Sequence, residues 1–231
     1  MRSDTARARR AFLASSLGVG SLLAGCTGRL TDDSDADADV SDGYGIVHPI
    51  ADWAENDPVL GPPPDEAEFG LILVSDPSCQ YCREFDAEIF EPMKADLIDE
   101  GRLSYVYRPY PKVRDWATLA GYAMLAAWER DGSAFLPLKG HYYETAVELS
   151  ERDLPERTAD LLDAETGVDG EEVVAAVEDR ELVDELAETG DAVREADMTT
   201  VPSYAILSEG EVTTTSGVQS YGNVKRMLGV E

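Results

Sequence analysis

The segment FGLILVSDPSCQYCREF, residues 69–85, predicts a strand, a turn and a helix that carries two cysteines. The aliphatic run at residues 71–74 is typical of a strand buried on both faces, and we expect it to end at Ser75. Beyond the turn, apolar residues recur at spacings of three and four, namely Cys82, Phe85, Ile89, Met93 and Leu97. This pattern predicts a helix that begins at or near Cys79. Pro92 is expected to kink it, because proline lacks an N–H donor and clashes with the preceding turn.

Two of the three cysteines, Cys79 and Cys82, have C-x-x-C spacing. A closed zinc site needs four ligands, and only His48 and His141 could add to the pair, so the sequence favours neither zinc nor copper. A purely structural disulfide would close a loop so short that it removes little entropy from the unfolded chain. The pair is therefore better suited to a bond that is repeatedly made and broken, although an inert disulfide remains an alternative.

The two cysteines are expected to differ in reactivity. Cys79 should lie over unpaired N–H groups at the start of the helix, where hydrogen bonds and the helix dipole stabilise a thiolate. Arg83 is expected to add a nearby positive charge. Negative charge opposes a thiolate, and three acidic residues lie close in the sequence, namely Asp76, Glu84 and Asp86. We expect the short-range effects to prevail, which makes Cys79 the nucleophile and the more buried Cys82 the resolving thiol.

The first 25 residues have the layout of an export signal, with a basic start, an apolar run at residues 12–23 and small residues before Cys26. A run of this length reaches only about 18 Å as a helix, short of the roughly 30 Å hydrocarbon core. The pair Arg9 and Arg10 resembles a twin-arginine signal, and residues 23–26 resemble a lipoprotein box that ends in a lipidated Cys26. A plain secretory signal with an unmodified Cys26 is the alternative.

Residues 26–45 are predicted to be the lipidated cysteine and an acidic, disordered linker, because TDDSDADADVSD at residues 31–42 has little to bury. Residues 46–231 should then form one domain. The formal net charge of -28 argues against nucleic acid and anionic lipid surfaces as partners. Only four lysines occur, and this composition resembles the surface of a protein adapted to very high salt; an ordinary acidic surface is the alternative.

The segment SDPSCQYCREF, residues 75–85, resembles the active-site segment of the thioredoxin-like superfamily, most closely its DsbA-like branch. A second strand at residues 103–108 would complete a β-α-β unit with the cysteines at its switch point. The stretch TTVPSYAILSEGEVTTTSG, residues 199–217, then predicts two antiparallel strands, and residues 221–228 a closing helix. The predicted fold class is α/β, a thioredoxin-like fold with a central mixed sheet.

The resemblance implies that the Val201–Pro202 bond is cis and that the backbone of Val201 receives a substrate strand. It also implies that Pro202 and the dipeptide Gln80–Tyr81 contact the substrate. Two features depart from the family. The dipeptide lacks the histidine of the strongest oxidases, and the strand at residues 71–74 lacks the buried carboxylate that relays a proton in some relatives.

A helical insertion is predicted at about residues 112–196, between the two halves of the fold. Helical patterns occur at residues 115–129, 149–162 and 171–188, and an insertion of this kind is typical of DsbA-like proteins. His141 is interpreted as a satisfied core or surface side chain. The aromatic residues of this region are interpreted as helix-packing core rather than as a peptide groove, namely Tyr107, Tyr110, Trp116, Tyr122, Trp128, Tyr142 and Tyr143.

These features predict a thiol-disulfide oxidoreductase for exported proteins, in first place a dithiol oxidase. The alternatives are a reductase for cytochrome maturation or exported thiols, and a peptide-binding lipoprotein with an inert disulfide. No metal and no cofactor beyond the Cys79–Cys82 disulfide is expected. The expected partners are exported proteins with thiols and a membrane redox protein. The chain is expected to be a monomer, lipid-anchored at the outer face of the cytoplasmic membrane.

Overall fold

The computed structural model of the chain describes residues 48–51 and 57–230. The predicted export signal at residues 1–25, the lipidated Cys26 and the linker up to residue 45 lie outside the described residues. Within the part of the chain that is described, no helix has both the length and the apolar character needed to cross a membrane.

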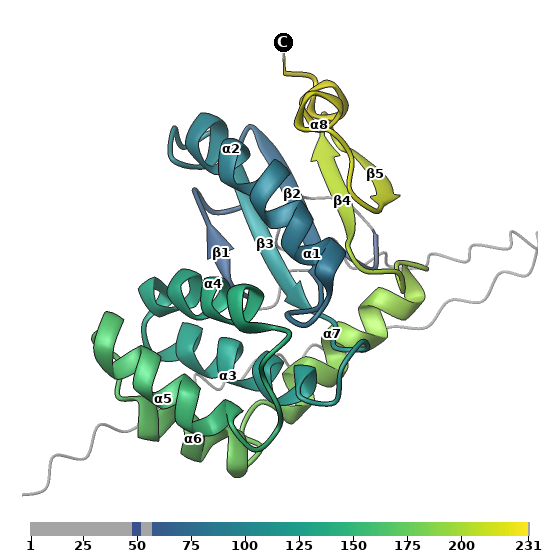
Figure 1. Cartoon of the computed structure of the whole chain (residues 1–231). Coiled ribbons are helices and arrows are strands. Elements are labelled where there is room, and N and C mark those ends of the chain that lie inside the picture. The colour runs from purple at the N-terminus through teal and green to yellow at the C-terminus, as the bar shows by residue number, and fades with distance from the viewer. Residues whose placement is uncertain (1–47, 52–56, 231) are drawn as a thin grey trace, which may run out of the picture. The chain divides into compact units, whose positions relative to one another are not determined.

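The described residues form a mixed five-stranded sheet with the strand order β1-β3-β2-β4-β5, which confirms the predicted fold class (Figure 1). The central strands β2 and β3 are parallel, and the other neighbouring pairs are antiparallel. The strands are β1 (Val59–Leu60), β2 (Phe69–Ser75), β3 (Leu103–Pro109), β4 (Ser203–Ser208) and β5 (Glu211–Ser216).

Both faces of the two central strands are covered, which explains their continuous apolar sequences. Leu71 and Leu73 of β2 lie in the largest hydrophobic cluster, and the alternate residues Ile72 and Val74 lie in a second cluster. Successive side chains of a strand point to opposite faces, so each cluster takes every second residue. The parallel register sets Ile72 beside Val106, and both belong to the same cluster.

The helix that carries the cysteines is α1 (Gln80–Phe85), and it begins one residue after Cys79, as predicted. It continues through a π-helical turn at Asp86–Phe90, the short α2 (Glu91–Met93) and a second π-helical turn at Lys94–Ile98. The irregularity expected at Pro92 therefore takes the form of widened turns on both sides of it. Such turns bond i to i+5, so the helix continues although proline supplies no N–H.

The predicted insertion contains five α-helices, with a 3₁₀ turn before the second of them. In Figure 1, α3, α4, α5 and α6 gather together and α7 leads back toward β4. The helices are α3 (Ala117–Arg130), α4 (Phe135–Thr145), α5 (Leu154–Glu165), α6 (Gly170–Glu178) and α7 (Val183–Glu195), and the chain ends with α8 (Tyr221–Leu228).

Three details of the insertion differ from the sequence prediction. Helix α4 was not predicted, because Pro137 interrupts its pattern; it lies in the first turn, where a proline costs no hydrogen bond. Helix α5 begins at Leu154, after a turn, rather than at residue 149. The single pattern predicted at residues 171–188 is two helices, and the chain turns between them at Arg180, whose φ is 55°.

The aromatic residues of β3 and the insertion mainly build the core, as interpreted from the sequence. Trp116 and Tyr142 are buried with ring centroids 6.1 Å apart, and Tyr107 packs on Phe135 at 5.2 Å. His141 differs from its prediction as a satisfied side chain. Its Nε2 atom is buried and has no hydrogen-bond partner among the described residues.

A buried ion pair joins the insertion to the cysteine helix. Lys139 of α4 lies 2.5 Å from a carboxylate oxygen of Asp86, and its ammonium group lies 3.4 Å from the centroid of the Phe90 ring. Burial raises the pKa of Asp86 and lowers the pKa of Lys139, and the attraction between the two charges opposes both changes. Asp86, one of the three acidic residues close to Cys79 in the sequence, is therefore neutralised by Lys139 from another helix.

Candidate active site

Asp76 fixes the two loops that surround the cysteines. Its side chain is buried directly after β2, and one carboxylate oxygen accepts hydrogen bonds from the backbone N–H of Ser78 at 2.7 Å and from the Ser78 hydroxyl at 2.6 Å. The other oxygen accepts from the backbone N–H groups of Lys112 and Val113, at 2.7 and 2.8 Å. Four donors thus tie the turn after β2 to the loop after β3, a role that the sequence analysis missed.

We expect Asp76→Asn to lower the free energy of unfolding by about 3 kcal/mol. The amide nitrogen of asparagine would face one pair of N–H donors, and those buried donors would lose a charged acceptor. Chemical denaturation measures the loss. The exposed Asp65 is the matched control, and Asp65→Asn should change the stability by less than about 0.5 kcal/mol. Equal effects of the two substitutions would contradict the role given to Asp76.

Cys79 is the N-cap of α1 and holds its sulfur at the helix end. The pKa of Cys79 is lowered from 9.0 to about 6, in first place because the Cys82 thiol donates a hydrogen bond to its sulfur. The backbone N–H groups of Cys82 and Tyr81 donate as well, while burial and the charge of Asp76 oppose the shift. The short-range donors therefore outweigh the acidic surroundings, as the sequence predicted. Arg83 is not among the groups that shift this pKa; it donates to the backbone carbonyl of Tyr143 at 3.4 Å.

Cys82 has the opposite character. Its side chain is fully buried, and burial raises the pKa of Cys82 far above its usual range, with the hydrogen bond to Cys79 as a second cause. The backbone N–H of Asp76 donates to its sulfur at 3.4 Å, and Ser75 supplies a side-chain hydrogen bond. The Ser75 hydroxyl lies 2.8 Å from the hydroxyl of Tyr143, so α4 of the insertion contributes to the surroundings of the buried thiol.

Alkylation of Cys79 in the reduced protein is expected to follow a titration with a midpoint near pH 6. The thiolate is the reactive form, so the rate should fall as the pH falls through this value. The same depressed pKa stabilises the reduced fold above the pKa of an unfolded cysteine, about 8.5, and this contribution is lost as the pH falls toward 6. Alkylation rates at a series of pH values test this. Cys82→Ala removes the main donor and should raise the midpoint; a midpoint near 8.5 in the unsubstituted protein would contradict the prediction.

The second half of the fold brings a cis proline to the cysteines. The Val201–Pro202 peptide bond is cis, as expected, and the backbone carbonyl of Val201 lies 3.8 Å from the sulfur of Cys79. A cavity of about 460 Å³ opens beside that sulfur, and Gln80, Tyr81 and Val201 are among the residues that line it. Tyr81 is 57% exposed. Three of the four residues predicted to contact a substrate, Gln80, Tyr81 and Val201, therefore line one cavity. The fourth, Pro202, is not in its lining but follows Val201 in the chain.

Among the described residues, no group of three or more His, Cys, Asp or Glu side chains is arranged so that it could hold a metal ion. A stabilised thiolate at a helix N-terminus, one turn from a buried thiol and opposite a cis proline, defines a thiol-disulfide oxidoreductase of thioredoxin-like fold. The chain belongs to the thioredoxin family, because the sequence model of the family described as Thioredoxin matches residues 54–220.

Solved structures with the same fold are DsbA-like proteins. Oxidised BdbD from Bacillus subtilis has a TM-score of 0.61 and 18% identity, over 76% of this chain and 92% of that chain. The alpha-DsbA1 of Wolbachia pipientis has a TM-score of 0.63 and 18% identity, over 77% and 91% of the two chains. The catalytic domain of ScsC from Proteus mirabilis has a TM-score of 0.59 and 18% identity, over 76% and 89%. At these identities the similarity establishes the fold. No curated protein matches the chain.

Proposed function

We propose that the chain is a dithiol oxidase for exported proteins, in which Cys79 is the reactive sulfur and Cys82 the resolving one. The observation that supports this direction is the lowered pKa of Cys79. A stabilised thiolate favours the reduced form of the protein, so the Cys79–Cys82 disulfide gives up its bond readily to a client. No cofactor beyond this disulfide takes part in the proposal.

In the proposed cycle, a client thiolate attacks the sulfur of Cys79 in the disulfide. A bond forms between the client and Cys79, the Cys79–Cys82 bond breaks, and Cys82 leaves and takes up a proton. A second client thiolate then attacks the client sulfur of the mixed disulfide and releases Cys79 as a thiolate. The client has lost two electrons and two protons, and the protein has gained the two electrons. A membrane redox protein must remove them before the next cycle.

The client strand is proposed to lie in the cavity beside Cys79. The backbone of Val201 would pair with it, and Pro202, Gln80 and Tyr81 would contact its side chains. The short distance from the Val201 carbonyl to the Cys79 sulfur supports this arrangement, because a strand paired there would pass over the reactive atom. The exposed Tyr81 ring and Gln80 amide beside the cysteine leave room for clients of different sequence.

The location of the protein is proposed from the sequence of its first 45 residues. A diacylglycerol group on Cys26 would hold a monomer at the outer face of the cytoplasmic membrane, with the acidic linker keeping the domain off the surface. The acidic composition fits a surrounding of very high salt. The mass of the mature protein should include the diacyl group, and Cys26→Ser should release the protein from membranes; an unmodified Cys26 in the mature protein would refute the anchor.

The equilibrium of the Cys79–Cys82 pair with a glutathione buffer decides the direction of exchange. We expect a reduction potential above about −180 mV, in the range of oxidants such as protein disulfide isomerase and DsbA. A potential at or below about −230 mV would instead assign the protein as a reductase. A pair that does not exchange with glutathione would leave the peptide-binding role with an inert disulfide. Cys79→Ser provides the blank for the assay.

A further inference from the structure

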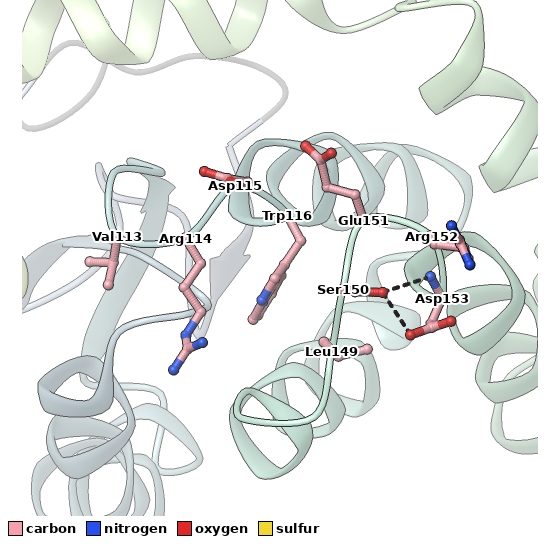
Figure 2. A pocket seen from close by; sticks show the side chains of 9 residues that line it. All are labelled: Val113, Arg114, Asp115, Trp116, Leu149, Ser150, Glu151, Arg152 and Asp153. Carbon is pink, nitrogen blue, oxygen red and sulfur yellow. Dashed lines mark hydrogen bonds between the residues drawn. The ribbon is translucent and has the colours of Figure 1, made fainter.

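A second cavity adjoins the one beside Cys79. It has a volume of about 770 Å³ and lies between residues 113–116, which follow β3, and residues 149–153, which precede α5 (Figure 2). The two cavities share Val113 and Arg114 in their linings, so the second cavity lies next to the one that holds the reactive sulfur. A polypeptide that reacts with Cys79 can therefore extend into the second cavity.

Trp116 in this cavity carries an unused hydrogen-bond donor. Its side chain is 3% exposed, and its indole N–H is buried without a hydrogen-bond partner among the described residues. A buried donor without a partner costs free energy, so an acceptor that reached this N–H would gain a hydrogen bond that the protein alone does not supply. Figure 2 shows the indole nitrogen on the side of the ring that faces the Arg114 side chain. An acceptor between them would receive hydrogen bonds from both.

The second cavity, which holds this donor, carries both signs of charge: Arg114 and Arg152 line it together with Asp115, Glu151 and Asp153, and the Asp153 carboxylate accepts a hydrogen bond from the Ser150 hydroxyl. The cavity beside Cys79 is lined by two cations, Lys112 and Arg114, and by no carboxylate, although the formal net charge is -28. Arg114 forms no ion pair within the described residues. In Figure 2 the carboxylates of Asp115 and Glu151 lie on the opposite side of the second cavity from the Arg114 guanidinium group.

We propose that Arg114 and the Trp116 indole form an anion subsite that binds a carboxylate side chain of the client, a few residues from the client cysteine. The inference rests on the proposed function only in that a client must react at Cys79; it holds for either direction of exchange. Guanidinium and indole N–H groups together suit a carboxylate, because both are donors and one carries charge. The client class is thus acidic at this position.

The subsite acts against the long-range field of the protein. A net charge of -28 repels an acidic peptide at low salt, so without the subsite an acidic client should react more slowly than a neutral one. Salt shortens the Debye length from about 10 Å at 0.1 M to about 3 Å at 1 M, which removes repulsion from distant charges first. Direct contact with Arg114 is screened less. A preference for acidic clients should therefore persist or grow as salt increases.

The test measures rates of disulfide exchange between the oxidised protein and peptides with one cysteine. The peptides carry glutamate or glutamine at successive positions on either side of the cysteine. Each rate is divided by the rate of the same peptide with a small aromatic disulfide, which corrects for the intrinsic reactivity of the peptide thiol. We expect glutamate at the favoured position to accelerate exchange on the order of 10-fold at 1 M salt, the scale of one charge-assisted contact.

Two variants assign the effect to the subsite. Arg114→Gln should bring the ratio of the glutamate rate to the glutamine rate to about 1, and Trp116→Phe should reduce this ratio by removing the N–H donor. Arg226→Gln, on α8, makes the same change of net charge and should keep the full preference. Loss of the preference in Arg226→Gln as well would assign it to net charge and overturn the subsite.

The outcomes separate this inference from the proposed function. If all peptides react and glutamate gives no advantage at any position, the subsite is refuted while the redox function stands. If no peptide forms a mixed disulfide with Cys79, the redox function itself fails.

Discussion

Cys82→Ala is expected to stop turnover and to trap the protein in mixed disulfides with its clients. With one thiol left, the Cys79 thiolate can attack a client disulfide and expel one client thiolate, but no neighbouring sulfur can then resolve the bond. The catalysed oxidation of a dithiol peptide, or the reduction of the corresponding peptide disulfide, should fall to the uncatalysed rate. Complexes that separate on reduction should accumulate, and mass spectrometry should place the bond at Cys79.

Cys79→Ala is the matched variant, and it should form no such complexes. The remaining Cys82 is fully buried, and burial raises the pKa of its thiol, so it is neither accessible nor ionised. Both variants should therefore lack turnover while only one accumulates covalent complexes. Complexes in Cys79→Ala, or turnover in either variant, would show that the two sulfurs do not have the roles assigned here.

Lys139→Met is expected to lower the free energy of unfolding by about 3 kcal/mol, because it leaves the largely buried Asp86 carboxylate without its counterion. Denaturant unfolding at pH 7 measures this loss. Burial already raises the pKa of Asp86, and removal of the ammonium group should raise it further. An acid with a raised pKa in the folded state gains stability by binding a proton, so the loss should shrink as the pH falls.

Two further variants test that explanation. Asp86→Asn combined with Lys139→Met removes both charges and should recover most of the stability. Lys94→Met breaks an ion pair with Asp99 that is partly exposed to solvent, and it should cost at most about 1 kcal/mol. A double variant as unstable as Lys139→Met would mean that packing of the Lys139 side chain, rather than its charge, explains the loss.

The local sequence was sufficient to predict the elements that contribute the cysteines. The aliphatic run of β2 and the helical spacing after Cys79 are contained in a few consecutive residues, and the structure places strand and helix within two residues of the prediction. The different characters of Cys79 and Cys82 also follow locally, because one caps the helix and the other faces the core. The cis bond at Pro202 was predicted from resemblance, since no local pattern requires it.

The helices of the insertion were predicted less well than the strand and helix that hold the cysteines. Helix α4 contains a proline and has no strongly amphipathic sequence, although its buried residues, Phe135, Leu138, Lys139, Tyr142 and Tyr143, lie on one face. The buried face includes the charged Lys139 and the apolar Leu136 lies outside it, which weakens the contrast between apolar and polar faces on which sequence prediction depends. The break between α6 and α7 at Arg180 has no glycine or proline to mark it.

The sequence by itself determined the redox pair, the strand and helix that hold it, and the acidic character of the chain. Only the tertiary structure decided that Asp76 ties two loops together, that Lys139 neutralises Asp86, and that Arg114 and Trp116 share a cavity close to Cys79. Asp76 and Lys112 are 36 positions apart in the sequence, and Asp86 and Lys139 are 53 positions apart. Such contacts depend on which elements pack together, and no periodicity within one segment encodes that choice.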